Sequence, residues 1–416
     1  MKYNLLFVDD EAQILDGIQD SLRKYREQWN MTFVCGGEAA IVEMTLKKYD
    51  VIICDMRMPQ IDGVDVLTYA KVHYPETIRI VLSGYSEIEN TIVVSSLAHR
   101  YLTKPCDKSE LEAVIQSCME VSGKLKNSIV KNIAGSIDLL PVNDDHYQRI
   151  LAQLDNDKTP LSDIAETIET DIALTSKLLH LVNSAFFRRQ RKIDSVKEAA
   201  AYLGADLVKS MVLANQFFTV AENLPNIDPL WVSRLQQHSW FSASIAKKLM
   251  GDTEHAEAAF TATLLHEVGL LALAAERSDL LRKLLESNES AFYDNEKSSE
   301  DNSSQNSNSL QEELGAYLLN LWGMPFNIVE AVAFYKQPSE RECDCFDIVG
   351  AVHVANYLAE ICMKSHADDF ALSTLDDAYL ERVGQAGKME DWLDVALETA
   401  VECGLENLIQ TSVKAA

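Results

Sequence analysis

Positive charge is scarce in this sequence. Its 416 residues include 37 Lys and Arg against 64 Asp and Glu, which gives a formal net charge of -27 at pH 7 and a pI near 4.7. A nucleic-acid interface needs a basic face that contacts phosphates, yet the one basic cluster, at 188–192, is short. A helix-turn-helix pattern with a basic recognition helix is also missing. The composition therefore argues against direct nucleic-acid binding and against a transcription factor.

Cysteine pairs at metal-site spacing are lacking too. The eight cysteines form no CxxC motif, and the closest pair, Cys343 and Cys345, has no second pair or histidine at zinc-finger spacing. Cys35, Cys54 and Cys118 lie in apolar surroundings. We therefore expect reduced, buried thiols, as in a cytosolic protein, and no structural zinc site.

Long apolar stretches are missing as well. The N-terminus offers only the apolar run at 5–8 before three acidic residues, which is too short for a signal peptide. We recognise no apolar run that is long enough to cross a bilayer, so we expect a cytoplasmic protein without membrane contact. A chain of 416 residues exceeds what one core usually holds, which predicts two or three domains.

The N-terminal part alternates apolar runs with segments of helical periodicity. The apolar runs that predict strands include 4–8, 51–54, 78–82 and the stretch around 101–102. The helical segments are 11–26, 37–48, 63–73, 87–97 and the stretch from 108 onward. Five βα units of this kind predict an α/β fold, with a doubly wound, five-stranded parallel sheet and helices on both faces.

Polar residues follow these predicted strands at their carboxyl ends. The buried run at 51–54 ends in Asp55, and three other strand ends carry Asp9, Asp10, Ser83 and Lys104. Ligands bind at the carboxyl edge of open parallel sheets, and a cluster of carboxylate oxygens suits Mg²⁺. A lysine and a hydroxyl nearby would suit phosphate. The pattern therefore predicts a site where Asp55 attacks a phosphoryl group.

These motifs resemble those of a known family. The segments LLFVDDE, VIICDMRMPQIDG, IVLSGYS and YLTKP, in this order, make residues 1–122 similar to the receiver domain of two-component response regulators. The resemblance implies that Asp55 accepts a phosphoryl group from a sensor histidine kinase. It also implies a Mg²⁺ site at Asp55, with Asp10 and the backbone carbonyl of Arg57 as direct ligands and Asp9 acting through water.

The same resemblance implies a conformational switch. Lys104 would pair with the phosphate, Ser83 would move toward it, and Tyr101 would turn inward in response. Pro105 would be the proline that follows the lysine. Gly84 stands where many receivers carry alanine, and the extra backbone freedom leaves the amplitude of the switch open.

After the receiver region the sequence is helical throughout. A near-heptad spacing of apolar residues predicts a linker helix at 107–136, which overlaps the receiver C-terminus. This helix could pair with a second copy in a homodimer or pack on the next domain, and the spacing leaves both open. Further along, Pro160, Ser195 and Asp228-Pro229 indicate helix starts.

Two of the predicted helices carry inward-facing histidines. His238 shares the apolar face of its helix, and His266 with Glu267 comes near the end of the next one. Two helical histidines with an acid could hold a divalent metal and activate water, as in a phosphohydrolase. They could also be core histidines satisfied by hydrogen bonds, because Asn356 stands where a hydrolase would want a further histidine or aspartate.

This region resembles a second family. Residues from about 130 to 365 are similar to the HDOD domain, a non-hydrolytic relative of the HD phosphohydrolases, and we place this all-α domain at 137–345. The matching segments are LLPVNDDHYQRILAQL, DIALTSKLLHLVNSAFF, AAAYLGADLVKSMVLA, HSWFSASIAKKL, AFTATLLHEVG and GAYLLNLWGMP. The hydrolases have His, then His-Asp, then a later Asp, whereas this chain has His238, His266-Glu267 and Asn356. The resemblance therefore implies a degenerate HD site, with no cofactor and no hydrolase activity.

Two further segments complete the chain. Residues 287–309 are rich in Ser, Asn, Asp and Glu, which predicts a disordered insertion in the HDOD domain. The helical stretches at 346–416 either finish the HDOD domain or form a small separate subdomain, and the sequence leaves this open.

The combined features predict a response regulator. Mg²⁺-dependent phosphoryl transfer from a histidine kinase to Asp55 would control a non-catalytic HDOD module that binds downstream signalling proteins. The alternative is a receiver-gated, metal-dependent phosphodiesterase or nucleotidase of the HD type.

Overall fold

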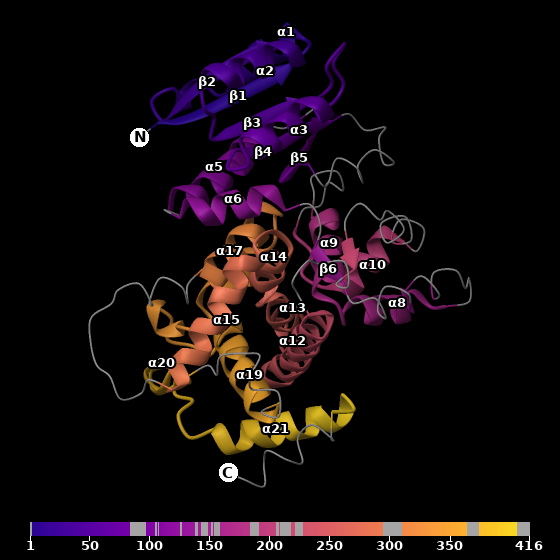
Figure 1. Ribbon diagram of the computed structural model, residues 1–416, viewed down its shortest axis with the longest axis vertical. Coiled ribbons are helices and arrows are strands. Elements are labelled where there is room, and N and C mark those ends of the chain that lie inside the picture. Colours follow the sequence, from indigo (N-terminus) through magenta and orange to yellow (C-terminus); the bar gives the residue numbers. More distant parts are fainter. Residues whose placement is uncertain are drawn as a thin grey trace. The chain divides into compact units, whose positions relative to one another are not determined.

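The computed structural model divides into two compact units (Figure 1). Unit 1 comprises residues 1–139, 180–192 and 317–324, and unit 2 comprises 140–179, 193–316 and 325–416. The structure describes residues 2–83, 97–104, 106, 108–124, 127–137, 140–142, 149–150, 153, 159–183, 191–204, 208, 218–220, 228–293, 310–363 and 374–405.

Unit 1 contains a five-stranded parallel sheet with the strand order β2-β1-β3-β4-β5. Its strands are β1 (Tyr3–Asp9), β2 (Trp29–Cys35), β3 (Val51–Asp55), β4 (Ile78–Ser83) and β5 (Arg100–Thr103). Every residue of the central strand β3 is buried, as expected for a parallel sheet that is covered on both faces. The predicted doubly wound α/β fold is therefore confirmed.

Helices cover this sheet. They are α1 (Ala12–Ser21), α2 (Gly37–Leu46), α3 (Gly63–His73), α5 (Lys108–Lys124) and α6 (Ser128–Ser136), with a 3₁₀ turn, η1, at Arg23–Tyr25. The α3 helix has the bounds predicted from the sequence. The helix predicted at 87–97 lies outside the described residues, except for its last one.

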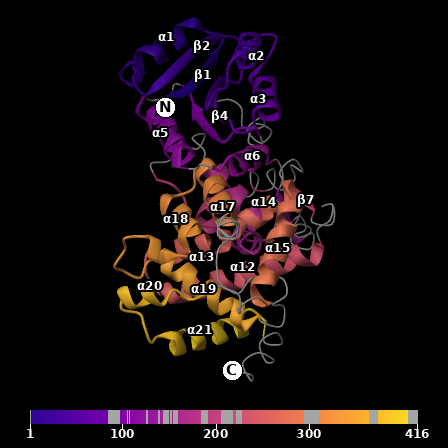
Figure 2. The same ribbon diagram turned by 60° about the vertical axis from the view of Figure 1, so that its left-hand side comes forward.

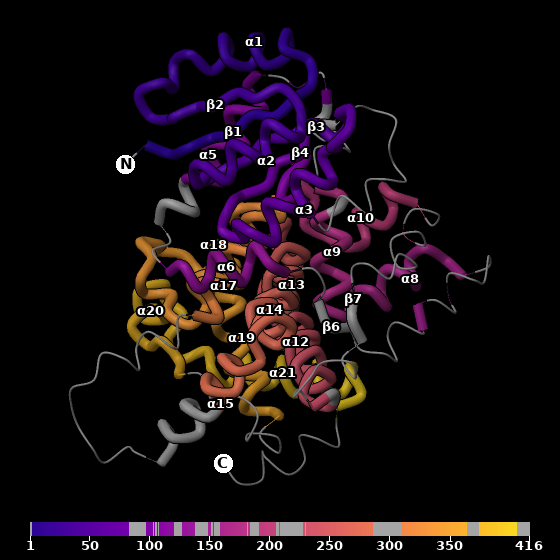
Figure 3. Tube along the Cα trace, turned by 45° about the horizontal axis from the view of Figure 1, so that its top comes forward, coloured from indigo at the N-terminus to yellow at the C-terminus, as the bar shows by residue number. Residues whose placement is uncertain are grey.

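The segment predicted as one linker helix contains two helices instead. The α5 helix ends at Lys124, and α6 begins at Ser128 with Asn127 as its N-cap, whose side chain accepts a hydrogen bond from the Ile129 amide. Figure 3 traces the two helices separately. A capping asparagine starts a new helix because its side chain satisfies an otherwise unpaired backbone amide.

The apolar side of α6 packs onto the sheet layer of unit 1. Val130, Ile133 and Ala134 are buried, and α6 contacts α3. The buried side chain of Arg79, in β4, donates from Nη2 to the Gly135 carbonyl at 2.8 Å and from Nε to the Leu97 carbonyl at 2.6 Å. Burial lowers the pKa of Arg79 to about 9, so the guanidinium stays charged at neutral pH and binds these carbonyls strongly.

Unit 2 is mainly helical, as predicted. Its helices are α8 (Leu161–Ile168), α9 (Ile172–Val182), α10 (Val196–Leu203), α12 (Pro229–Met250), α13 (Ala256–Leu265), α14 (Val268–Glu276), α15 (Ser278–Tyr293), α17 (Leu310–Leu321), α18 (Phe326–Phe334), α19 (Ile348–Cys362), α20 (Asp377–Arg382) and α21 (Met389–Glu402). The last residues of α9 and α17 belong to segments of unit 1. Two short parallel strands, β6 (Leu140–Val142) and β7 (Phe218–Val220), were not predicted for this all-α region. A 3₁₀ turn, η4, spans Pro338–Glu340.

The predicted helix starts occur where the sequence indicated them. Asp228 caps α12 by accepting from the Leu230 amide, Pro229 is its first residue, and the Ser195 side chain accepts from the Glu198 amide at the start of α10. The long α12 helix then packs against α13, α19 and α21 (Figure 2). This helix is therefore the centre of the unit 2 core.

One apolar segment differs from our expectation. Among the described residues, the stretch Ala256–Glu276 is long and apolar enough to span a membrane, and 94% of its most apolar window is buried inside the protein. Such burial is typical of a core helix. The stretch is not one uninterrupted helix, because α13 and α14 meet at His266 and Glu267.

Two smaller expectations need correction. Cys54 and Cys118 are buried as predicted, but Cys35 is exposed, because it is the last residue of the edge strand β2. The α15 helix continues to Tyr293, inside the stretch 287–309 that we predicted to be a disordered insertion. The rest of that stretch lies outside the described residues.

The close approach of α6 to the loop between α3 and β4 gives a testable prediction. A Cβ atom on Gly135 would lie 1.7 Å from the Pro75 carbonyl oxygen. We therefore expect Gly135→Ala to lower the free energy of unfolding by about 1 to 3 kcal/mol, as overpacked sites do. Thermal unfolding and hydrogen exchange of residues 127–137 in the full chain measure this.

The matched control is Gly17→Ala in α1, where an added Cβ meets no atom within 4 Å. Alanine in an open helix position should stabilise the protein by about 0.5 to 1 kcal/mol. Equal effects of the two substitutions would show that α6 does not pack as described.

Candidate functional site

The first candidate site lies at the carboxyl edge of the parallel sheet. Asp9 ends β1, Asp55 ends β3, and Lys104 directly follows β5. Because parallel strands in register end at the same edge, the backbone ladder brings these side chains together. The Lys104 Nζ lies 2.7 Å from Asp9 Oδ2 and 2.8 Å from Asp55 Oδ1.

Three carboxylates cluster at this edge. Asp9, Asp10 and Asp55 each offer an oxygen, and these oxygens lie within 4.8 Å of one another. Asp9 has no solvent exposure and Asp55 is 6% exposed, while Asp10 is partly exposed. Closely spaced carboxylate oxygens are the ligands that Mg²⁺ prefers, so the residues present fit that ion.

The electrostatics of the site favour a bound cation. Burial raises the pKa of Asp55, the Lys104 ammonium opposes this shift, and the negative Asp9 adds to it. Burial acts to lower the pKa of Lys104, but hydrogen bonds and charge from Asp55 and Asp9 outweigh it, so that pKa is raised. The lysine therefore stays charged, and a further positive charge would favour ionised Asp55.

The loop after Asp55 turns back sharply. A Cβ atom on Gly63 would lie 2.3 Å from the Asp55 carbonyl oxygen, and the Gly63 amide donates to the Met56 carbonyl at 3.0 Å. Asp62 then caps α3 through the Asp65 amide at 3.0 Å, and Gln60 has a φ of 71°. Our sequence reasoning gave Asp62 and Gly63 no role, although an Asp-Gly pair before a helix is the signal that marks such a turn.

The structure describes the other predicted receiver residues only in part. Ser83 ends β4 and its backbone pairs with Thr103, but the structure does not describe its side chain. Tyr101 is 7% exposed, and burial raises its pKa well above the usual value. The Arg57 side chain is exposed, and Pro105 lies outside the described residues.

The second candidate site lies in unit 2, where three helical segments meet. His238 comes from α12, His266 and Glu267 come from the junction of α13 and α14, and Asn356 comes from α19. The His238 Nδ1 lies 3.2 Å from Glu267 Oε2, and His266 Nε2 lies 2.8 Å from Asn356 Oδ1. All four residues predicted for this site therefore form one buried cluster.

Two further polar residues join the cluster that sequence reasoning missed. The Ser239 hydroxyl donates to Glu267 Oε2 at 2.7 Å, and the Asn356 amide donates to Glu360 Oε1 at 2.8 Å. Glu360 lies one helical turn after Asn356, which is the spacing of side chains that meet on a helix. No comparable spacing indicates Ser239.

The distances within this cluster favour a bound metal ion, but the hydrogen bonds of His266 oppose one. Nitrogen and oxygen atoms of His238, His266 and Glu267 lie within 4.8 Å of one another, which is close enough to surround an ion. However, His266 Nε2 faces Asn356 Oδ1, whose amide is oriented by Glu360, and His266 Nδ1 faces the Thr263 carbonyl. A ring nitrogen that donates to oxygen has no lone pair for a metal.

Two side chains of the cluster, His238 and Glu267, carry opposite charges. Burial acts to raise the pKa of Glu267, but the adjacent His238 and His266 outweigh it and lower that pKa to about 2. Burial acts to lower the pKa of His238, but the Glu267 charge outweighs it, so that pKa is raised. Burial lowers the pKa of His266. The arrangement is therefore a His238–Glu267 ion pair beside a neutral histidine.

Family comparisons agree with both regions. A family model described as the response regulator receiver domain matches residues 5–116, and one described as the HDOD domain matches residues 140–338. The first match spans the parallel sheet and its carboxylate site. The second spans β6 to α18 and includes His238, His266 and Glu267.

Similar curated proteins match over the N-terminal region. The hydrogenase transcriptional regulatory protein HoxA of Cupriavidus necator is 31% identical over 121 residues, which are 29% of this chain and 24% of HoxA. The alkaline phosphatase synthesis transcriptional regulatory protein PhoP of Bacillus subtilis is 26% identical over 171 residues, which are 38% of this chain and 68% of PhoP. The chain thus spans about a quarter of the length of HoxA.

Similar chains are also found among solved structures. The MmoQ response regulator of Methylococcus capsulatus is 24% identical and has a TM-score of 0.45, with coverage of 62% of this chain and 98% of MmoQ. The signal receiver domain of an HD domain-containing protein from Pseudomonas fluorescens is 25% identical and has a TM-score of 0.29, with coverage of 30% of this chain and 100% of that domain.

The buried ion pair predicts a pH dependence of stability. Because the pKa of Glu267 falls from 4.5 to about 2 on folding, its contribution is present above pH 4.5 and lost as the pH falls toward 2. The pKa of His238 rises from 6.5, so its contribution is present below pH 6.5 and lost as the pH rises through the folded value. We expect Glu267→Gln to remove both of these pH-dependent contributions to stability and to lower the free energy of unfolding by about 3 kcal/mol.

Denaturant unfolding of the full chain at several pH values, followed by circular dichroism, measures this. The control is Glu257→Gln, which removes a partly exposed ion pair with Lys247 and should cost less than about 1 kcal/mol. Indistinguishable pH profiles of the two variants would contradict the buried pair.

Proposed function

Because the chain is a response regulator with a receiver domain followed by an HDOD domain, we propose that phosphorylation of Asp55 controls its HDOD module. The observation that supports this is the position of Lys104, within hydrogen-bond distance of both Asp9 and Asp55. An ammonium group at this place can neutralise a phosphoryl oxygen as charge develops. The proposed phosphoryl donor is a sensor histidine kinase in the cytoplasm.

Each receiver residue has a proposed role. The Asp55 carboxylate is the nucleophile, and Lys104 binds the transferred group. Asp9, Asp10, Asp55 and the Arg57 carbonyl would hold Mg²⁺, which supplies charge neutralisation when bound. Ser83, Tyr101 and Pro105 form the proposed switch. Burial of Tyr101 supports an inward position for that ring.

The HDOD module is proposed to act by binding other proteins rather than by catalysis. Asn356 is neutral, the neutral His266 keeps a lone pair on only one ring nitrogen, and Glu267 already accepts from Ser239 and pairs with His238, so the cluster supplies few free ligands for a catalytic ion. The net charge of -27 supports protein partners over nucleic acid. The downstream partner would therefore be another signalling protein.

The domain limits are also part of the proposal. We assign the receiver domain to 1–122 and the HDOD domain to 137–345, and we propose that the helices at 346–416 complete the HDOD core. Asn356 of α19 bonds His266, and α21 packs on α12, which supports one core. The buried face of α6 favours packing of the 107–136 linker within the chain over homodimer pairing.

The phosphoacceptor assignment gives the next prediction. We expect Asp55→Asn to abolish labelling by acetyl phosphate in Mg²⁺, because an amide cannot form the acyl phosphate. Omission of Mg²⁺ should abolish labelling of the unchanged protein. Peptide mapping by mass spectrometry identifies the labelled residue.

The matched control is Asp16→Asn, at an exposed position of α1, which should be labelled normally. Labelling of Asp55→Asn equal to that of the unchanged protein would disprove the assignment. Hydrogen exchange with beryllium fluoride then tests control of the HDOD module, and changes confined to residues 2–104 would mean that the two domains are only tethered.

The absence of hydrolase activity is a separate prediction. We expect no turnover of cyclic dinucleotides or nucleotide phosphates in Mg²⁺, Mn²⁺ or Fe²⁺, because a catalytic ion needs several placed ligands and an open position for water. Elemental analysis of the purified chain accompanies the assay. Turnover that disappears in a folded His266→Ala variant would favour the alternative, a receiver-gated HD-type phosphodiesterase or nucleotidase.

A further inference from the structure

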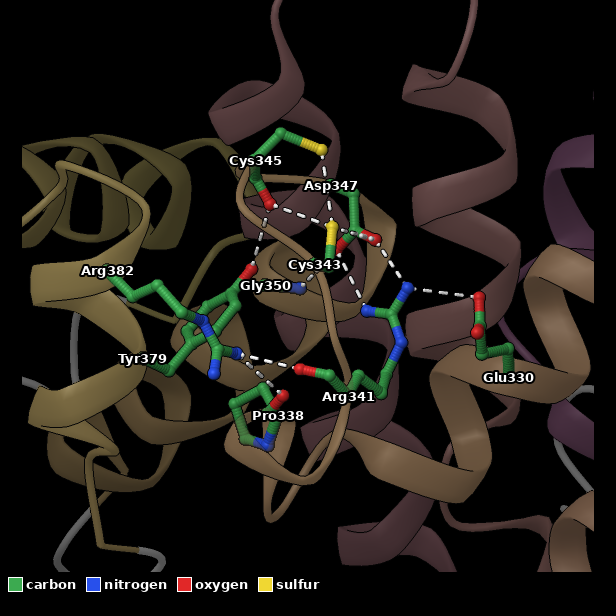
Figure 4. A network of polar contacts seen from close by, with 9 residues as sticks. All are labelled: Glu330, Pro338, Arg341, Cys343, Cys345, Asp347, Gly350, Tyr379 and Arg382. Atoms are coloured by element: carbon green, nitrogen blue, oxygen red, sulfur yellow. Dashed lines mark hydrogen bonds and ion pairs between the residues drawn. The ribbon is translucent and has the colours of Figure 1, made fainter.

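A pair of cysteines lies in the loop between η4 and α19 (Figure 4). The Cys343 Sγ is 3.3 Å from the Cys345 Sγ. The structure describes all eight cysteines of the chain, and among them this is the one pair for which it gives a sulfur–sulfur contact. This arrangement belongs neither to the receiver edge nor to the histidine cluster.

Solvent reaches this pair. Cys345 is exposed and Cys343 is partly exposed, whereas Cys54, Cys118 and Cys362 are buried. Oxidation of thiols depends on access of the oxidant as well as on chemistry. An oxidant in the solvent can therefore reach this pair more readily than it can reach the buried cysteines.

The loop that carries the thiols is anchored at its ends. The Arg341 guanidinium donates to both Asp347 oxygens, at 3.3 Å and 2.8 Å, and to Glu330 at 3.1 Å. Asp347 also caps α19 through the Gly350 amide. Figure 4 shows these contacts around the two sulfur atoms. Since the backbone on both sides is fixed, little further ordering is needed to bring the sulfurs together.

Further contacts hold the thiols within this frame. The Cys343 thiol faces the Cys345 carbonyl at 3.5 Å and Asp347 Oδ2 at 3.7 Å, and the Tyr379 hydroxyl donates to the Cys345 carbonyl at 3.5 Å. A disulfide bond joins its sulfurs at about 2.05 Å. The two sulfurs must therefore move closer than their present separation of 3.3 Å.

We propose that Cys343 and Cys345 form a reversible intramolecular disulfide, and that the oxidant of this site is a hydroperoxide. One thiol loses its proton, and its thiolate sulfur attacks the terminal peroxide oxygen. The O–O bond breaks, a sulfenic acid forms, and the leaving alkoxide takes up a proton to give an alcohol (water, for hydrogen peroxide). The second thiol sulfur attacks the sulfenic sulfur, the S–S bond forms as the S–O bond breaks, and the displaced hydroxide takes up the thiol proton and leaves as water. The two sulfurs are oxidised, and the peroxide is reduced.

The size of the closed loop makes the bond labile. A bridge across one intervening residue removes little entropy from the unfolded chain, so it adds little stability. Constrained and exposed disulfides are also the ones that reduce readily. The proposed bond is therefore a reversible modification and not a structural crosslink.

Protonation sets the rate of the first step. The hydrogen bond with Cys343 raises the pKa of Cys345, and burial and the Asp347 charge act in the same direction, while Arg341 opposes them. Because the thiolate is the nucleophile, oxidation should accelerate by about tenfold per pH unit at pH values well below the thiol pKa.

The experiment treats the full chain with hydrogen peroxide. We expect each chain to lose two titratable thiols and to recover them with dithiothreitol. Digestion with trypsin and chymotrypsin releases the segment 342–346, which holds both cysteines but not Cys362. This peptide should be lighter by two hydrogens after oxidation.

Matched variants separate this pair from the other thiols. Cys343→Ser and Cys345→Ser should each abolish the paired thiol loss, whereas Cys35→Ser, at another exposed cysteine, should retain it. Circular dichroism confirms that the variants are folded. The proposal is overturned if the loss persists in Cys343→Ser, if the peptide only gains oxygen, or if a non-reducing gel shows crosslinked chains.

Discussion

The shared edge of the parallel strands is the constraint on which the receiver site depends. Strands that run in the same direction and in register end together, so single residues at their ends meet without any dedicated loop. Asp9 and Asp55 reach the same lysine in this way. The absence of a side chain at Gly63 then lets the start of α3 approach the Asp55 carbonyl closely.

Much of this site could be predicted from the sequence because its placement follows from the backbone ladder. Asp9, Asp55 and Lys104 needed only the correct assignment of strands. The linker could not be predicted in the same way, since a near-heptad spacing looks alike whether its apolar face meets a second copy or the sheet. The cap at Asn127 and the hydrogen bond between Arg79 and the Gly135 carbonyl both depend on tertiary structure, so the spacing alone could not indicate them.

The histidine cluster shows a second limit of sequence reasoning. His238, His266, Glu267 and Asn356 could be chosen from a family pattern, but the Ser239 hydroxyl could not, because its role depends on how α12 approaches the start of α14. The exposure of Cys35 was missed for a related reason. Apolar neighbours indicate a strand, yet they do not tell whether that strand lies at the edge of the sheet.

The group of Asp9, Asp10, Asp55 and Lys104 also sets an electrostatic balance. With all groups ionised, three carboxylates and one ammonium leave two uncompensated negative charges, which one divalent cation would cancel. In the proposed reaction a phosphoryl group of charge about -1.5 to -2 would replace the single charge of Asp55. The edge would then carry excess negative charge that no group described there offsets. This excess negative charge would attract any hydrogen-bond donor that can approach the edge. Phosphorylation of Asp55 would therefore itself favour a rearrangement of the groups around it.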